Sequence, residues 1–176
     1  HRIARRQRQM CIRDSIYCDY ICMVKTPQAI QMSSFASPQE QLALTVLHTA
    51  STMLNHHRAL LKPYGITPEQ FNILRILRGQ QGHPLALRDI SGRMIDRNSN
   101  TSRLVDKLIA KGLVRREPCP SDRRRVDIAL TDEGDTLTAE LKAVMDENMR
   151  SLQSVWTSEN ALKAIDILDA WNDTQP

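Results

Sequence analysis

Residues 99–130 read SNTSRLVDKLIAKGLVRREPCPSDRRRVDIAL, and their pattern predicts a helix followed by a two-stranded hairpin. Its first part has helical spacing, because at 100° per residue the apolar side chains share one arc. That arc holds Thr101, Leu104, Val105, Leu108 and Ile109. Gly112 stands where a helix-ending glycine belongs.

Leu113 and Val114 begin a strand that Pro118 and Pro120 should break. From Arg125 to Leu130 the residues alternate, with Val126, Ile128 and Leu130 on one face, which predicts a half-buried second strand. Residues 120–124 between the strands should form a hairpin tip.

Helical patterns lie on both sides of this stretch. A short helix over 87–94 should precede the helix over 99–111, with a turn at 95–98 between them. Asn98 should be the N-cap of the helix over 99–111. Further upstream, Ser37 and Thr67 begin capping signals for helices over 37–64 and 67–78. Downstream, Thr131 can cap a long helix whose apolar seam runs from Leu137 to Val155, and a short helix follows near Trp171. The order of helix, turn, helix and hairpin predicts a mainly α protein with a small β-hairpin wing, a winged helix-turn-helix.

The charge is unevenly distributed along the chain. The net charge is +4 over 176 residues, but residues 88–125 hold 11 basic and 5 acidic side chains. Residues 126–176 hold 3 basic and 11 acidic side chains. Such a basic block predicts contact with a polyanion, although solvated helix faces are the alternative.

The polar arc of the helix over 99–111 and the arginines of the hairpin are the candidate DNA-binding groups. Serine, asparagine and arginine can bond base edges in the major groove, and arginine suits a narrow minor groove. The expected helix contacts are Asn98, Ser99, Asn100, Ser102, Arg103 and Lys107. The expected wing contacts are Arg123, Arg124 and Arg125, with Asp122 offsetting part of their charge and holding the loop's shape.

Three segments resemble the MarR family of bacterial regulators. DRRRVDIALTDEG at 122–134 resembles the family's wing signature, Asp-Arg-Arg-x-x-x-(Val/Ile)-x-Leu-Thr-x-x-Gly. ITPEQFNILRIL at 66–77 resembles its second helix, and RLVDKLIAKGLV at 103–114 resembles its recognition helix and following strand. The resemblance covers about residues 37–172, and Ala86 departs from it because many members carry a serine or threonine cap there.

The resemblance implies a homodimer that binds a double-stranded DNA operator with an inverted repeat, most often as a repressor. It places the recognition helix in the major groove and the wing in the minor groove. It also implies a small phenolic or lipophilic effector, bound between the dimer helices and the DNA-binding lobe, that loosens the grip on DNA. The expected role is therefore a cytoplasmic transcriptional regulator, with no cofactor and no membrane partner.

The terminal helices have little to bury against within one chain, which also favours a dimer. The expected interface residues are Leu42, Val46, Leu152, Trp156, Leu162, Ile165 and Leu168. The expected organisation is a dimerisation helix at 33–66, a DNA-binding lobe at 67–133 and C-terminal dimerisation helices at 134–176. Residues 1–32 are expected to be a disordered or non-native leader with a start at Met23 or Met32, or else a basic DNA-binding arm.

Two other function classes remain open from the residues. Cys119 lies near arginines, so a thiol-based redox sensor that releases DNA on oxidation is one alternative. An enzyme containing a winged lobe is the other, but the sequence offers no paired acid and base for it. His48, His56 and His57 lack the spacing of a zinc site, so no metal and no catalytic residue is expected.

Overall fold

The computed structural model describes residues 26–32, 34–119, 122–153 and 155–174, and gives only the backbone at 119, 122–125 and 151. The chain divides into two compact units, His1–Asn55 and His56–Pro176. Each is described by itself below. The expected leader start at Met23 lies outside the described residues, and so does most of the expected leader.

The first unit holds a short helix, α2 (Thr26–Ala29), and most of α3 (Pro38–Leu61), which continues into the second unit. Ser37 caps α3 as expected, since the Glu40 N–H donates to Ser37 Oγ at 3.1 Å. The Glu40 carboxylate accepts from the Ala36 N–H at 2.6 Å, one residue earlier than in a standard capping box. The helix ends through the 3₁₀ turn η2 (Lys62–Tyr64) at Gly65, where φ is +65°, which confirms the expected end.

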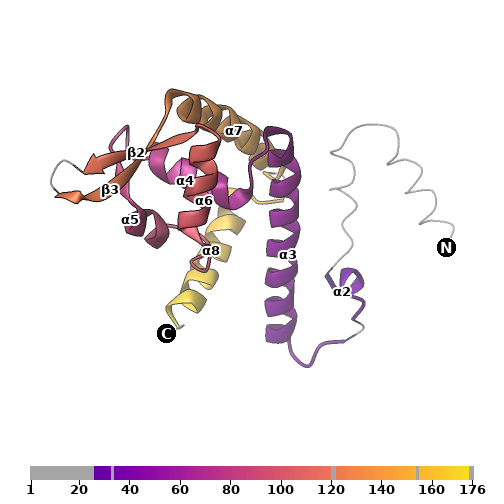
Figure 1. Cartoon of the computed structure of the whole chain (residues 1–176). Helices are drawn as coiled ribbons and strands as arrows, with labels where there is room; N and C mark the ends of the chain where they lie inside the picture. The colour runs from indigo at the N-terminus through magenta and orange to yellow at the C-terminus, as the bar shows by residue number, and fades with distance from the viewer. Residues whose placement is uncertain (1–25, 33, 120–121, 154, 175–176) are drawn as a thin grey trace, which may run out of the picture. The chain divides into compact units, whose positions relative to one another are not determined.

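The second unit contains the winged helix-turn-helix (Figure 1). Its elements in chain order are α4 (Pro68–Arg78), β1 (Leu85–Ala86), α5 (Leu87–Gly92), α6 (Thr101–Ala110), β2 (Val114–Cys119), β3 (Asp122–Leu130), α7 (Asp132–Ser151) and α8 (Ser158–Asp173). The predicted capping box at Thr67 is present, because Gln70 N–H donates to Thr67 Oγ1 at 3.3 Å and Thr67 N–H donates to Gln70 Oε1 at 3.2 Å. The predicted fold class is confirmed.

The sheet has three antiparallel strands in the order β1-β3-β2, one more than the predicted hairpin. The added strand is β1, where Leu85 pairs with Ile128 and Ala86 with Asp127. Two residues are too short to give a strand pattern in the sequence. The prediction that Pro118 breaks the first strand is also wrong, since Pro118 lies within β2. An edge strand such as β2 tolerates proline because one of its sides needs no ladder hydrogen bond.

The predicted alternation along β3 is wrong as well. Val126 is 49% exposed, whereas Asp127 and Ala129, expected on the outer face, are buried. The reason is that β3 is the central strand, and α4, α5 and α7 all contact it. A strand with neighbours on both edges and helices against it does not have one wet face.

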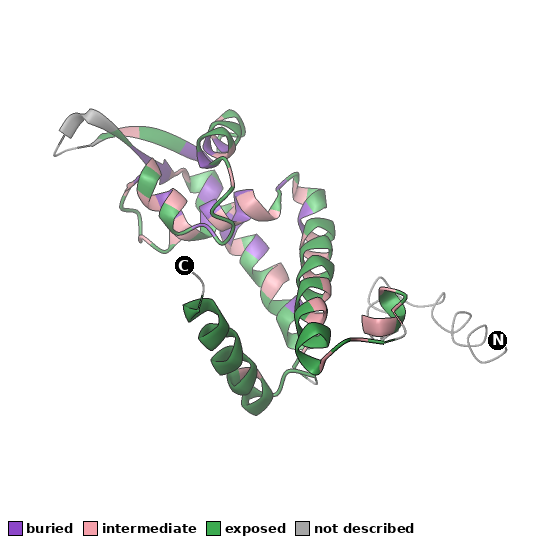
Figure 2. Ribbon diagram, turned by 90° about the horizontal axis from the view of Figure 1, so that it is seen from below, coloured by how far each residue is buried: buried purple, intermediate pink, exposed green. Residues whose placement is uncertain are grey.

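The core gathers apolar side chains from several elements of the second unit (Figure 2). Ile73 and Leu74 of α4, Ile90 of α5, Leu108 of α6 and Leu141 of α7 are all fully buried. Their convergence fixes α6 on the body, so its outer face is presented from a rigid support.

The C-terminal helices differ from the prediction in length. The apolar seam was expected to run to Val155 within one helix, but α7 ends at Ser151 and Val155 is 48% exposed. A turn replaces the last part of the seam, in which Trp156 N–H donates to the carbonyl of Leu152 at 2.8 Å. α8, expected to be short, has 16 residues and begins after Thr157, whose side chain accepts from Asn160 N–H. None of the described helices is long and apolar enough to cross a membrane.

Candidate nucleic-acid interface

Helix α6 is amphipathic in the predicted sense. Thr101, Val105 and Leu108 are buried, and Leu104 and Ile109 are half-buried. On the opposite arc the side chains are exposed; these are Ser102, Arg103, Asp106 and Lys107. The exposed arc therefore carries a hydroxyl and the guanidinium of Arg103 in the first turn of the helix, with Asp106 and Lys107 further along it. Hydroxyl and guanidinium groups suit the edges of DNA bases.

The start of α6 lies two residues later than predicted. Asn100, not Asn98, is the N-cap, because its Oδ1 accepts from the Arg103 N–H at 3.1 Å. Asp96 explains the shift. Its carboxylate accepts from Asn98 N–H at 3.0 Å and from Ser99 Oγ at 3.1 Å, which holds these residues in a turn rather than in a helix.

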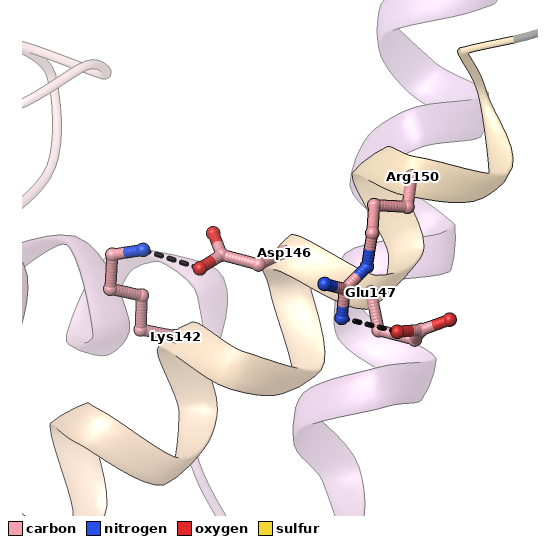
Figure 3. A network of polar contacts seen from close by, with 4 residues as sticks. All are labelled: Lys142, Asp146, Glu147 and Arg150. Atoms are coloured by element: carbon pink, nitrogen blue, oxygen red, sulfur yellow. Dashed lines mark hydrogen bonds and ion pairs between the residues drawn. The ribbon is translucent and has the colours of Figure 1, made fainter.

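The ion pairs of α6 differ from those of α7. On α7, Lys142 pairs with Asp146 and Arg150 with Glu147 along the same helix (Figure 3). All 10 residues of α6 are described, and no such pair lies within it. Its single acid, Asp106, instead reaches Arg116 of β2 at 2.6 Å. The cations Arg103 and Lys107 are therefore not neutralised by their own helix.

The Asp106–Arg116 pair also links α6 to β2 of the wing. A second arginine of β2, Arg115, pairs with Glu117 at 2.7 Å and donates to the carbonyl of Leu130 on β3. Both Arg115 contacts lie within the β2–β3 hairpin and hold its base together, and β2 begins next to α6 (Figure 1). The base of the wing and α6 therefore lie next to one another.

Arg123 and Arg124 were expected on the hairpin tip, which is wrong for the backbone, whereas Arg125 lies in the strand as expected. Asp122 to Arg125 belong to β3, and Cys119 pairs with Asp122. The register then jumps, because the preceding residue Pro118 pairs with Val126. Arg123, Arg124 and Arg125 are therefore the extra residues of a bulge, which bends and twists a strand. The side chains of Cys119 and of 122–125 lie outside what the structure describes.

Sequence reasoning passed over two cations close to this surface. Arg93 and Arg97 are both exposed and lie in the segment between α5 and α6. The density of arginine in residues 88–97 was the signal that could have found them. Ala86 is the N-cap residue of α5 and makes no side-chain cap bond, as expected. It is buried and pairs with Asp127 in the sheet, so the start of α5 is held by the β1–β3 ladder instead.

Comparison with known proteins decides the family. The model of the MarR family matches residues 66–126. The regulator PecS of Dickeya dadantii (strain 3937) is 35% identical over 127 residues, covering 69% of this chain and 74% of PecS. The regulator YsmB of Bacillus subtilis (strain 168) is 32% identical over 112 residues, covering 64% of this chain and 75% of YsmB. The chain belongs to the MarR family.

Solved structures agree with the family's fold. The S. aureus MepR–DNA complex superposes with a TM-score of 0.67 at 24% identity, over 76% of this chain and 98% of that chain. This likeness concerns the fold. Family membership and the regulators it contains support a DNA-binding transcriptional regulator, and they place this MarR-family chain among regulators rather than enzymes.

One of the histidines of α3 has a partner on another helix. His56 Nε2 lies 2.6 Å from Asn148 Oδ1 on α7, and Asn148 is buried. Burial, together with the charges of His56 and Arg75, lowers the pKa of His57 below 6.5. Among the residues that the structure describes, no three His, Cys, Asp or Glu side chains gather as a metal site would require.

The predicted interface residues of this MarR-family protein are mostly exposed. Their exposed fractions are 52% for Leu42, 37% for Val46, 43% for Trp156, 61% for Leu162, 50% for Ile165 and 41% for Leu168, while Leu152 is half-buried. In α8, which is described from end to end, no residue is buried (Figure 2). Their role in a dimer stays a prediction.

Proposed function

We propose that this protein is a sequence-specific, double-stranded-DNA-binding repressor that acts as a homodimer on an inverted repeat. The observation that carries the proposal is the exposed polar arc of α6, joined to the β2–β3 wing through Asp106 and Arg116. The relatives support the repressor role, since MprA of Escherichia coli (strain K12), 27% identical, is named a transcriptional repressor. A regulator of this kind has to reach the chromosome, so we propose a cytoplasmic location.

The base-reading residues are those at the start of α6. Ser102 and Arg103 are exposed, and Asn98, Ser99 and Asn100 lie in the turn before them. Lys107 and the wing residues Arg123, Arg124 and Arg125 supply attraction for phosphates and for the minor groove. Asp122 offsets part of the wing charge.

Two outcomes separate these roles. Replacing Arg103 with Ala should cost about 1–3 kcal/mol selectively at one base position. Replacing Arg123 and Arg124 with Ala should weaken binding to every sequence and flatten the salt dependence by about one unit per lost phosphate contact. Unchanged operator affinity in both variants would contradict the assignment.

The dimer rests on apolar surface that the chain does not cover by itself. α8 exposes Leu162, Ile165 and Leu168, three large apolar side chains at helical spacing on a helix without a buried residue. Such a stripe is expected to meet a partner. A two-fold dimer would set its recognition helices about 34 Å apart, on successive major grooves.

Light scattering tests the dimer directly. Replacing Ile165 and Leu168 with Glu should halve the mass in solution. Replacing Lys163, whose Nζ bonds Glu159 on the same helix at 2.6 Å, with Ala should leave the mass unchanged. A double variant that keeps the mass of the unmodified protein would exclude this interface.

A small phenolic or lipophilic effector is the proposed control of DNA release. One solved relative of the fold is NadR in complex with 4-hydroxyphenylacetate. In this chain a hollow of about 500 Å³ lies where α3 ends and α4 begins, and its lining includes Arg58, Lys62, Thr67 and Glu69. The hollow is open to solvent, and two of its lining residues, Arg58 and Lys62, are cations that suit an anionic phenolic acid. Titrating 4-hydroxyphenylacetate into the operator complex tests this, with Arg58→Ala and Lys62→Ala expected to abolish any release.

The decisive experiment for DNA recognition is selection of bound fragments from a random pool. A shared sequence with two-fold symmetry is the expected result. A pool that converges on no sequence, or on one half-site without a repeat, contradicts the proposal.

A further inference from the structure

An apolar side chain projects from the cationic turn that leads into α6. Ile95 is 84% exposed, more than any other large apolar side chain that the structure describes. Its neighbour Met94 is 5% exposed, and Asn72 Nδ2 of α4 lies 3.6 Å from the Met94 sulfur. Met94 is therefore packed in the core, while the next residue, Ile95, is exposed to solvent. The buried Met94 holds the backbone from which the Ile95 side chain projects.

The turn is also held from its other side. Asp96 accepts a bond from Ser99 Oγ, and the Ser99 N–H donates to the Asp96 carbonyl at 3.2 Å. Ser99 directly precedes Asn100, the N-cap of α6. Ile95 is thus next to Asp96, whose contacts with Ser99 hold the turn that leads into α6.

One acid, Asp96, which is bonded to Asn98 and Ser99, and two arginines lie around Ile95 in the sequence. Arg93 and Arg97 flank it and are exposed. A lone isoleucine between two arginines is a poor surface for an apolar protein partner, because docking it would also desolvate both guanidiniums. It suits a surface that offers phosphates around a small apolar group.

The major groove of DNA offers that combination at thymine. Among the base edges in the groove, the thymine C5-methyl is the apolar feature, and phosphates line both sides of the groove. We propose that Ile95 is a specificity-determining residue that contacts a thymine methyl in each half-site, with Arg93 and Arg97 supplying attraction for the neighbouring phosphates. The inference rests on the proposed DNA-binding function and adds a base contact from outside α6.

Replacing thymine by deoxyuridine removes the methyl and keeps every hydrogen-bonding group. In an operator obtained by selection, each thymine of a half-site is replaced in turn, and binding is measured for the unmodified protein and for Ile95→Ala. At one thymine position we expect about a fourfold loss for the unmodified protein in each half-site, the equivalent of one buried methyl group. Ile95→Ala should bind the original operator more weakly by at least that factor and show no further loss on deoxyuridine.

Two variants serve as controls. Ile95→Val keeps the branched methyl groups and should keep most of the sensitivity to deoxyuridine. Arg97→Ala should weaken binding to every operator of the series by the same factor. The ratio of the affinities for the thymine and deoxyuridine operators should stay unchanged. Because Ile95 is exposed, the melting temperature of Ile95→Ala should match that of the unmodified protein.

The outcomes separate this inference from the function beneath it. A selected operator whose thymines all tolerate deoxyuridine equally in both proteins overturns the role of Ile95 and leaves the proposed function standing. A lower mass of Ile95→Ala in solution would overturn it in favour of a contact between copies. A pool that yields no shared sequence overturns the proposed function and the role of Ile95 with it.

Discussion

Gly134 is the position where one added methyl group should do the most damage. A Cβ built there would lie 1.9 Å from the carbonyl oxygen of Leu113, whereas ordinary contacts begin at about 3.4 Å. That oxygen already accepts a hydrogen bond from the Thr131 N–H at 3.2 Å, and Gly134 N–H donates to Thr131 Oγ1 at 3.0 Å. The added carbon therefore meets backbone that is bonded in place at the junction of wing and α7, so a flexible side chain cannot relieve the clash.

The magnitude follows from that distance. Relief requires the start of α7 or the start of β2 to move by about 1.5 Å, which separates the wing base from the helix packed on it. Overpacking of this kind costs about 3 kcal/mol, at the upper end of the usual range because backbone has to move. For a chain of 176 residues this lowers the melting temperature of Gly134→Ala by about 6–12 °C. Urea and thermal unfolding followed by circular dichroism measure both quantities.

The chain supplies a matched control at Gly92. A Cβ there would meet nothing within 4 Å, and its φ is not in the left-handed region. Gly92→Ala should therefore be neutral or stabilise by about 0.4–1 kcal/mol through the unfolded state. If Gly134→Ala unfolds at the same urea concentration as Gly92→Ala, the close approach of α7 to Leu113 is not a constraint and the reasoning is refuted.

Three further predictions concern charge, pH and a buried bond. Asp106→Asn removes an acid from α6 and releases Arg116, so DNA affinity should rise for all sequences and the salt slope should steepen by about one unit. Asp146→Asn, which breaks an exposed ion pair on α7, should change neither the DNA affinity nor the salt slope. Equal effects of the two variants would contradict the prediction. The pKa of His57 in the folded chain is lowered from 6.5, so between the two pKa values the unfolded chain binds a proton at His57 and the folded chain does not. The free energy of unfolding should therefore fall as pH drops below about 6.5. His57→Gln should flatten that slope in urea titrations at successive pH values, and an unchanged slope rules out His57 as its source. Asn148→Ala removes the acceptor that lies 2.6 Å from a histidine of α3, and it should cost about 1–3 kcal/mol in thermal unfolding. A loss no larger than that of Asp146→Asn would show that this bond contributes nothing.

The helices could be predicted from the sequence because their signals are local. Ser37, Thr67 and Thr131 each cap a helix where the sequence indicates, and Gly65 ends one through a left-handed backbone. Capping depends on residues three positions apart, so no knowledge of the fold is needed.

The sheet could not be predicted in the same way, since its details are set by distant partners. β1 exists because Leu85 and Ala86 pair with Ile128 and Asp127 about 40 residues later, and two residues carry no period of their own. Burial on β3 likewise depends on which helices cover it, so Val126 is exposed although the alternation placed it with Ile128. The family's wing signature includes a glycine at position 134. The physical reason for that glycine is seen only in the structure, where an added Cβ would clash with the carbonyl of Leu113.

The start of α6 shows how a local error changes the chemistry assigned to a site. Asn98 was a plausible cap by residue type, yet the Asp96 carboxylate binds its N–H and the Ser99 hydroxyl, and the helix begins at the next asparagine. Asn100 Oδ1 is thereby used for the Arg103 N–H, which leaves its amide NH₂ as the group able to donate to a base. In the proposed DNA complex, base contacts that need a protein acceptor are then left to Asn98 Oδ1 and the serine hydroxyls, and Arg103 can donate to guanine O6 and N7. The cap therefore restricts which base edges the N-terminal end of α6 can read, and this restriction would survive any change in the wing.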